Sequence, residues 1–208
     1  GQLLQYLLMV AVSFALGFAL TYMFGYEDEV EEAAGAITEA ETDRLTEEAV
    51  TGTVVSPSEG VIQTPIVGDV VALSNVNDPV FSSGAMGQGI AVKPSQDVVY
   101  APADAEVTIV FPTGHAYGLR TANGAEILIH VGIDTVSMNG EGFNQKVNQG
   151  DKVKAGDVLG TFDSAKIAAA GLDNTTMVIV TNTADFASVN PVASGSVAKG
   201  DAIIEVKA

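Results

Sequence analysis

A strand–turn–strand pattern around one Asn-Gly pair is the feature that most constrains how this chain folds. The pair, at 123–124, lies between two runs of strand-forming residues in GHAYGLRTANGAEILIHVGID, residues 114–134. Asn-Gly is typical of a two-residue β-hairpin turn, because both central positions need a positive φ. The pattern therefore predicts an antiparallel hairpin in which Ala122 faces Ala125.

Short Val- and Ile-rich runs continue to alternate with Gly, Asn, Asp and Pro turns from Val61 to Ala208. The chain has 22 glycines and no tryptophan, which favours β-structure with tight turns over a helical bundle. We expect an all-β fold, an antiparallel β-sandwich or barrel with one or two short helices. One such helix is predicted at 164–173, with Ser164 as its N-cap and Gly171 at its end.

The beginning of the chain has a different composition. Residues 3–26 carry no charge, and as a helix they would span roughly 36 Å, more than the ~30 Å hydrocarbon core of a bilayer. A transmembrane helix is therefore predicted within 1–26. Residues 27–60 are acidic and contain few large apolar side chains, which is typical of a linker. The third expected part is a folded domain at 61–208.

Charge and cysteine content exclude several classes of function. The net charge is −17, and only nine Lys and Arg are scattered along the chain. Nucleic acid is not expected as a partner, because binding its phosphates needs clustered basic residues. The chain has no cysteine, which excludes a disulfide framework, a thiolate metal site and a cysteine nucleophile.

The only two histidines of the chain, His115 and His130, flank the predicted turn. In the expected register Tyr117 faces His130 and His115 faces Gly132, and side chains alternate between two faces. The histidines then become diagonal neighbours on one face, with Cβ atoms about 7–8 Å apart or less. The same face carries Thr113 and Asp134. The other face carries an apolar row suited to a core: Ile127, Ile129, Val131 and Ile133.

Two imidazoles at this distance suit phosphoryl transfer. A neutral imidazole is available as a nucleophile at neutral pH, and a second can donate a hydrogen bond to the charge that develops on phosphate. Metal binding is an alternative, since residues 130–134 have the His-x-x-x-Asp spacing found in zinc hydrolases and His115 could be a third ligand. Two histidines without a chemical task are the third possibility.

The double-histidine block resembles the glucose-type enzyme IIA domain of the bacterial phosphoenolpyruvate-dependent sugar phosphotransferase system. The resemblance runs from about Val61 to the C-terminus and includes NDPVFSSGAMGQGIAVKPS, VYAPADAEVT, VNQGDKVKAGDVLGTFD and VIVTNT. It implies a compact antiparallel β-sandwich. It also implies that His130 accepts a phosphoryl group on Nε2, that His115 stabilises the transferring group, and that Thr113 orients His115.

The resemblance also implies residues that bind partners. Asp78 and Asp134 match the acidic residues that receive an arginine of the phosphocarrier protein HPr. Backbone N–H groups near Gly132 are expected to cradle phosphate, because glycine permits close approach. An apolar docking surface is expected around the site, formed by Phe81, Met86, Phe111 and Leu128.

The segment 1–26 resembles the last transmembrane helix of a IIC permease domain. The order of helix, linker and IIA domain resembles the β-glucoside, sucrose or trehalose-type permeases, in which IIB, IIC and IIA share one chain. The resemblance implies a cell-membrane protein with the IIA domain on the cytoplasmic side, a IIB cysteine as the next phosphate acceptor, and no cofactor or metal. A zinc hydrolase of related fold, which would need an additional His-x-His, and a purely regulatory protein-binding domain are the alternatives.

Overall fold

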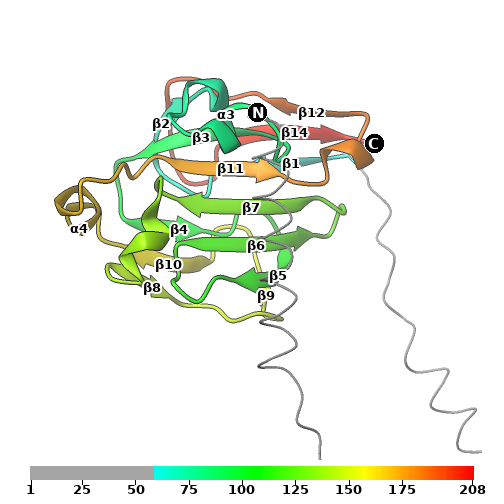
Figure 1. Ribbon diagram of the computed structural model, residues 1–208. Coiled ribbons are helices and arrows are strands. Elements are labelled where there is room, and N and C mark those ends of the chain that lie inside the picture. Colours follow the sequence, from blue (N-terminus) through cyan, green and yellow to red (C-terminus); the bar gives the residue numbers. More distant parts are fainter. Residues whose placement is uncertain (1–58) are drawn as a thin grey trace, which may run out of the picture. The chain divides into compact units, whose positions relative to one another are not determined.

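The structure, a computed structural model, describes residues 59–208. The predicted transmembrane helix, and the linker up to residue 58, lie outside the described residues. Within 59–208 no helix is long and apolar enough to cross a membrane. Most of the regular structure is β-strand (Figure 1). The strands are β1 (Gly60–Gln63), β2 (Gly68–Val71), β3 (Gln88–Pro94), β4 (Val98–Tyr100), β5 (Ala105–Val110), β6 (Ala116–Thr121), β7 (Glu126–Val131), β8 (Phe143–Gln145), β9 (Lys152–Val153), β10 (Val158–Phe162), β11 (Thr176–Val180), β12 (Ser188–Pro191), β13 (Ser196–Val197) and β14 (Ala202–Lys207).

The described residues contain two short α-helices, as expected for this fold class. They are α3 (Pro79–Ser82) and α4 (Ser164–Ala169), and the remaining helical turns are the 3-10 helices η1 (Leu73–Asn75), η2 (Thr135–Met138) and η3 (Thr183–Asp185).

The predicted helix at 164–173 is confirmed, but its N-cap is Asp163. The carboxylate of Asp163 accepts the backbone N–H of Lys166 at 3.0 Å, which satisfies one of the free donors of the first turn. Ser164 donates its hydroxyl to Asp97 instead, at 2.5 Å. Gly171 follows the helix with a φ of +75°, the left-handed conformation that commonly ends a helix.

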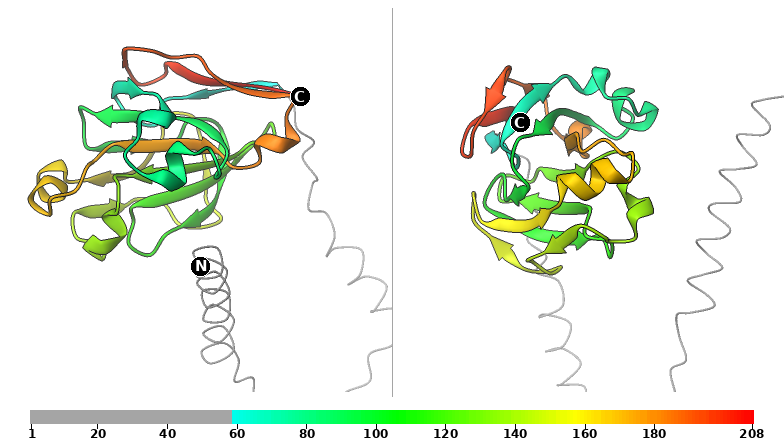
Figure 2. Two further views of the ribbon diagram at one scale, coloured as in Figure 1. Left: turned by 45° about the horizontal axis from the view of Figure 1, so that its top comes forward. Right: turned by 90° about the vertical axis from the view of Figure 1, so that its left-hand side faces the viewer.

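Every strand pair in the described residues is antiparallel, and the strands form three sheets. The largest has eight strands in the order β13-β2-β3-β11-β7-β6-β5-β9, and the other two have the orders β1-β14-β12 and β4-β10-β8. Figure 1 shows β11, β7, β6 and β5 side by side, with β14 and β12 along one edge of the view. Figure 2 shows the same sheets curving around a common interior. The predicted antiparallel sandwich or barrel is confirmed.

Two hydrophobic clusters stabilise the domain. The main cluster fills the interior between the sheets and includes Ile127 and Ile129 of β7, which are 2% and 0% exposed. A second, smaller cluster lies on the opposite face of the eight-stranded sheet, where Phe81 of α3 packs with Met177 and Ile179 of β11. The short segment that contains η1 and α3 therefore covers part of the outer face of the sheet.

The hairpin formed by β6 and β7 differs by one residue from the prediction. Its loop has three residues, 122–124, and the N–H of Thr121 donates to the carbonyl of Ala125 at 2.9 Å. The N–H of Gly124 donates to the carbonyl of Thr121 at 3.0 Å, and Gly124 has a φ of +86°. This is the three-residue loop in which a tight turn ends in a left-handed residue. Ala122 therefore does not face Ala125.

The changed register reverses the faces of all β6 side chains relative to those of β7. Tyr117 pairs with Ile129 rather than with His130, and Ala116 pairs with His130. Because side chains alternate along a strand, Tyr117 points into the main cluster, where it is 1% exposed. The prediction that Tyr117 shares a face with His130 is wrong. The predicted core row is confirmed for Ile127, Ile129 and Val131, but Ile133 lies beyond the end of β7 and packs against the second cluster.

Candidate active site

His130 lies at the end of β7, and its ring is held by the backbone that follows. Its Nδ1 is 2.8 Å from the carbonyl oxygen of Gly132. A carbonyl oxygen only accepts hydrogen bonds, so Nδ1 must carry the proton in the neutral ring. The lone pair is therefore on Nε2, the nitrogen that a phosphoacceptor histidine needs to have free.

His115 lies in the turn that connects β5 and β6. The turn closes through the N–H of Gly114, which donates to the carbonyl of Phe111 at 2.7 Å, and Gly114 has a φ of +68°. The Nδ1 of His115 is 2.5 Å from the hydroxyl oxygen of Thr113. The hydroxyl of Thr113 therefore contacts the ring of His115, which is only 3% exposed.

The two imidazole rings meet in the structure. Their centroids are 4.8 Å apart with an interplanar angle of 79°, so the edge of one ring faces the plane of the other. β6 begins beside the end of β7, and the N–H of Val131 donates to the carbonyl of His115 at 2.8 Å. His115 reaches the face of His130 because it lies in the turn before β6, where the alternation of strand side chains does not apply. The predicted meeting of the rings is confirmed, although the predicted register is not.

Aromatic side chains surround the histidine pair. The ring of Phe81 lies 5.1 Å from that of His130, and the ring of Phe111 lies 5.5 Å from that of His115. Phe143 of β8 lies 6.4 Å from His115, and the sequence analysis did not identify it. Its position depends on a contact between the β5–β6 turn and a distant strand, which no local pattern indicates.

Burial keeps both histidines uncharged near neutral pH. The pKa of His115 is lowered to about 4, mainly by desolvation and to a smaller extent by the neighbouring His130. Desolvation also lowers the pKa of His130, against the raising effects of the hydrogen bond to Gly132 and of the carboxylates of Asp78 and Asp134. A neutral pair is the state required for a nucleophile and a hydrogen-bond donor.

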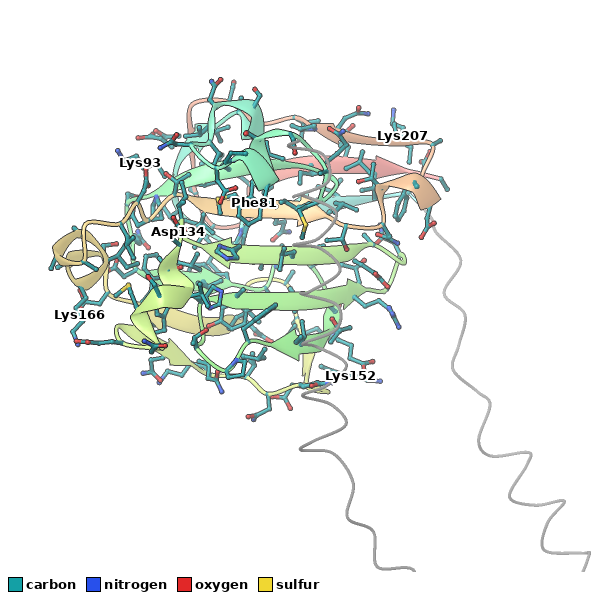
Figure 3. The ribbon with its side chains drawn as sticks, viewed as in Figure 1. Phe81, Lys93, Asp134, Lys152, Lys166 and Lys207 are labelled. Atoms are coloured by element: carbon teal, nitrogen blue, oxygen red, sulfur yellow. The ribbon has the colours of Figure 1, made fainter. Side chains whose placement is uncertain are left out.

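The two predicted acidic residues lie near His130, and each has a local structural setting. Asp78 is the N-cap of α3, where its carboxylate accepts the N–H of Val80 at 2.7 Å. Asp134 is exposed and precedes η2 with a φ of +58°, a left-handed conformation that Asp tolerates better than most residues. Figure 3 shows Phe81 and Asp134 on the same side of the molecule, near the end of β7.

The four predicted docking residues differ in how much surface they offer. Met86 and Phe111 are 38% and 37% exposed, and Leu128 is partly buried. Phe81 is 7% exposed and belongs to the second hydrophobic cluster, so the ring of His130 lies against a buried side chain. A partner protein could contact Met86 and Phe111 far more extensively than Phe81.

Gly132 does not have the free amide that the sequence analysis expected. Its N–H donates to the carbonyl of Thr175 at 3.1 Å, and the N–H of Ile133 donates to the carbonyl of Asp173 at 2.8 Å. These two amides are used within the fold and are not available to cradle phosphate. The contribution of Gly132 is its carbonyl, which accepts a hydrogen bond from the Nδ1–H of His130.

A metal site finds no support in the geometry. Among residues 59–208, no group of three or more His, Cys, Asp or Glu side chains is placed to hold a metal ion. His130 and Asp134 of the His-x-x-x-Asp spacing, and His115 as the third ligand, all lie in this part of the chain but do not form such a group. The zinc-hydrolase alternative therefore rests on spacing alone.

Comparison with known proteins gives relatives of one kind. The β-glucoside-specific EIIBCA component of the phosphotransferase system of Bacillus subtilis is 42% identical over 183 residues, which cover 88% of this chain and 27% of that protein. The glucose-specific EIIA component of Oceanobacillus iheyensis is 43% identical over 145 residues, which cover 70% of this chain and 88% of that protein. The chain thus spans about a quarter of the length of the EIIBCA relative.

A solved structure and a family model agree with these relatives. The glucose permease IIA of Mycoplasma capricolum has a TM-score of 0.65 and 33% sequence identity, and the match covers 71% of this chain and 96% of that one. Residues 60–186 match the family model described as phosphoenolpyruvate-dependent sugar phosphotransferase system, EIIA 1. The histidine pair, the antiparallel fold and these matches agree, and the chain belongs to the EIIA 1 family of the sugar phosphotransferase system.

Proposed function

We propose that His130 accepts a phosphoryl group from HPr on Nε2 and passes it to a cysteine of a IIB domain. The observation that carries this assignment is the hydrogen bond from His130 Nδ1 to the carbonyl of Gly132 at 2.8 Å. It holds the proton on the nitrogen that does not react. The family supplies the reaction, phosphoryl transfer, and the tautomer of His130 supports the assignment of the nucleophile.

The bonds exchanged in the two transfers can be written from this tautomer. In the first, the lone pair of His130 Nε2 forms a bond to phosphorus while the bond from phosphorus to the phosphohistidine of HPr breaks. No proton has to leave His130, because Nε2 carries none. In the second, the cysteine thiolate of IIB attacks phosphorus, and the electron pair of the phosphorus–nitrogen bond returns to Nε2. The site therefore needs no general base for His130.

His115 stabilises the charge on the transferring group in this proposal. If the hydroxyl of Thr113 donates to His115 Nδ1, the proton of His115 lies on Nε2, from which it can be donated to a phosphoryl oxygen. The short distance between the two ring centroids, 4.8 Å, puts such a donor beside the nucleophile. The lowered pKa of His115, about 4, keeps the ring neutral, so it donates a hydrogen bond and adds no charge of its own.

The surface around the pair suits a basic partner with an apolar centre. Asp78 and Asp134 act on His130 electrostatically, Phe111 is exposed beside His115, and Met86 is exposed as well. An arginine of HPr would be received by the carboxylates, while the apolar side chains exclude water from the reacting groups.

The larger setting is part of the same proposal. The domain would follow a membrane helix within 1–26 and a linker through 27–60, as the last part of a permease with IIB and IIC domains. The IIA domain would lie at the cell membrane on its cytoplasmic side, and its phosphate would drive sugar uptake coupled to phosphorylation. This arrangement is inferred from the EIIBCA relatives.

Phosphate incorporation tests the assignment of residues. The full 208-residue chain is incubated with phosphoenolpyruvate, enzyme I and HPr, and phosphate is measured by mass spectrometry. His130→Gln should abolish incorporation. His115→Gln is the matched control, because it replaces the other member of the pair. It should accept phosphate slowly and fail in transfer to IIB.

Two outcomes would count against the proposal. Unchanged incorporation in His130→Gln would remove His130 as the phosphoacceptor. Equal loss of incorporation in both variants would overturn the division of roles between His130 and His115.

A further inference from the structure

We propose that Asp173 is a positioning residue for the phosphoacceptor, acting through the peptide unit that joins Gly132 to Ile133. Asp173 lies between α4 and β11, far from His130 in the sequence and outside the residues identified from it. The proposal rests on the role assigned to His130 above. It concerns how the fold holds the proton on Nδ1 of that ring.

A single peptide unit connects Asp173 to His130. The carbonyl of Gly132 and the N–H of Ile133 belong to the same planar trans peptide, so they point in opposite directions. On one side the carbonyl oxygen accepts a hydrogen bond from His130 Nδ1, which lies 2.8 Å away. On the other side the N–H donates to the main-chain carbonyl of Asp173 at 2.8 Å. Fixing the carbonyl of Asp173 therefore fixes the direction in which the Gly132 carbonyl points.

The side chain of Asp173 fixes that carbonyl through a local turn. One carboxylate oxygen accepts both the N–H and the hydroxyl of Thr175, each at 2.7 Å. Such a turn sets the backbone between the Asp and the residue two positions later. The carbonyl of Thr175 in turn accepts the N–H of Gly132 at 3.1 Å. The carboxylate thus orders both backbone acceptors that hold the residues directly after His130.

The backbone at Gly132 is closely packed against its neighbours. A Cβ at Gly132 would lie 2.4 Å from Cγ2 of Thr135 and 2.8 Å from the carbonyl oxygen of Asp173. Thr135 is fully buried, and its hydroxyl donates to the carbonyl of Val131 at 2.5 Å. The Gly132 peptide is packed between η2 on one side and the Asp173 turn on the other. The Asp173 turn is therefore one of the two segments that position this peptide.

Loss of the Asp173 turn has a chemical consequence that ordinary destabilisation does not have. When the Gly132 carbonyl is free to turn, the His130 ring is no longer restricted to the Nδ1–H tautomer. In the other tautomer the proton lies on Nε2, and that nitrogen cannot attack phosphorus. The hydrogen bonds in series, from His130 through the peptide to Asp173, also polarise one another. Asp173 therefore increases the fraction of His130 rings that are in the reactive Nδ1–H tautomer. It does so without contacting His130 or the substrate.

The test compares the tautomer of His130 and the rate of phosphorylation in matched variants of the full chain. Asp173→Ala removes the acceptor of both Thr175 bonds, and Asp173→Asn keeps an oxygen in its place. Asp201→Ala is the control, because Asp201 accepts the N–H of Ala198 at 2.8 Å in a turn of another part of the fold. The tautomer is read from the ¹⁵N chemical shifts of the ring nitrogens at neutral pH.

We expect Asp173→Ala to show a mixture of His130 tautomers and a rate of phosphate incorporation from HPr roughly tenfold or more below wild type, since small misplacements of reacting groups cost that much. Asp173→Asn should keep the Nδ1–H tautomer and most of the rate, and Asp201→Ala should match wild type in both measurements. Thr175→Val removes only one of the two bonds and should give an intermediate effect, which keeps the test possible if Asp173→Ala does not fold.

A lowered melting temperature with unchanged tautomer and rate, in Asp173→Ala or in Thr175→Val, would overturn the proposal. So would an equal change in the Asp201→Ala control. Failure of the proposed function would look different, because wild-type protein would then take up no phosphate on His130. The tautomer measurement does not depend on phosphate uptake, and it separates the two failures.

Discussion

His115 should make the stability of the domain depend on pH between about 6.5 and 4. Its pKa in the folded protein is lowered from 6.5 to about 4, first by burial and then by the neighbouring His130. As the pH falls below 6.5 the unfolded chain binds a proton at this residue, whereas the folded protein does not until about pH 4. Falling pH therefore favours unfolding. Above pH 6.5 His115 is neutral in both states, so the stability that depends on its neutral ring is fully present there.

The size of the effect follows from the two pKa values. Each pH unit between them corresponds to 1.36 kcal/mol, so the difference between 6.5 and about 4 amounts to roughly 3 kcal/mol. This is a large fraction of the stability of an ordinary domain, which is about 5–15 kcal/mol. Most of the loss should occur before pH 4.5, since the ring in the folded protein begins to take up its own proton below that value.

The free energy of unfolding, measured in urea at pH 7.5 and 4.5, isolates this contribution. His115→Gln has no titrating ring at position 115, so its stability should fall with acid by roughly 2 to 3 kcal/mol less than that of wild type. Carboxylates that titrate in this range contribute equally to both proteins. In His130→Gln the contribution of His115 should largely remain, because burial is the largest cause of the lowered pKa of His115, and any further change in that variant reports the lowered pKa of His130 itself. Parallel pH profiles for wild type and His115→Gln would refute the reasoning.

Two further substitutions test contacts described above. Gly160→Ala in β10 should destabilise the domain by about 1–3 kcal/mol in urea unfolding, because its Cβ would lie 2.1 Å from the hydroxyl oxygen of the buried Tyr117. Adding Tyr117→Phe should recover part of that loss, and no recovery would show that another contact is responsible. Thr113→Val removes the hydroxyl that lies 2.5 Å from His115 Nδ1, and the initial rate of phosphate incorporation should fall roughly five- to tenfold. An unchanged rate would mean that Thr113 does not orient the ring.

The fold class and the meeting of the two histidines could be predicted from the sequence because both follow from local patterns. The alternation in β7 places Ile127 and Ile129 in the core and His130 on the other face. Any hairpin centred near Asn123 brings the start of β6 beside the end of β7. The meeting of His115 and His130 is therefore tolerant of the exact loop length.

The register was not predictable from the same pattern. Asn-Gly fits a two-residue turn, but it also fits a three-residue loop that ends on a left-handed glycine. The choice depends on bonds made around the loop, including the N–H of Ala125, which donates to the hydroxyl of Thr121 at 3.0 Å. One residue of difference moved Tyr117 from the outer face into the core.

The backbone contacts that support the ring of His130 could not be predicted from the sequence either. Asp173 and Thr175 hold Gly132 across a long sequence separation, and nothing near residues 130–134 indicates which segment will pack there. The same applies to Phe143 beside His115. Long-range contacts of this kind depend on how the sheets and loops pack, whereas periodicity reports only on neighbours in the chain.

The pairing of β1 with β14 has a consequence for how such a domain can be joined to others. Gly60 lies opposite Val206 in the register of these strands, and a Cβ at Gly60 would touch the side chain of Asn123 at the loop of the β6–β7 hairpin. The histidines lie at the other end of that hairpin, roughly 20 Å away along a six-residue strand. Figure 3 likewise shows Lys207 and Asp134 well apart. Both ends of the described fold thus lie on the same side of the domain, and a neighbouring domain could be attached to either end without covering the two histidine rings.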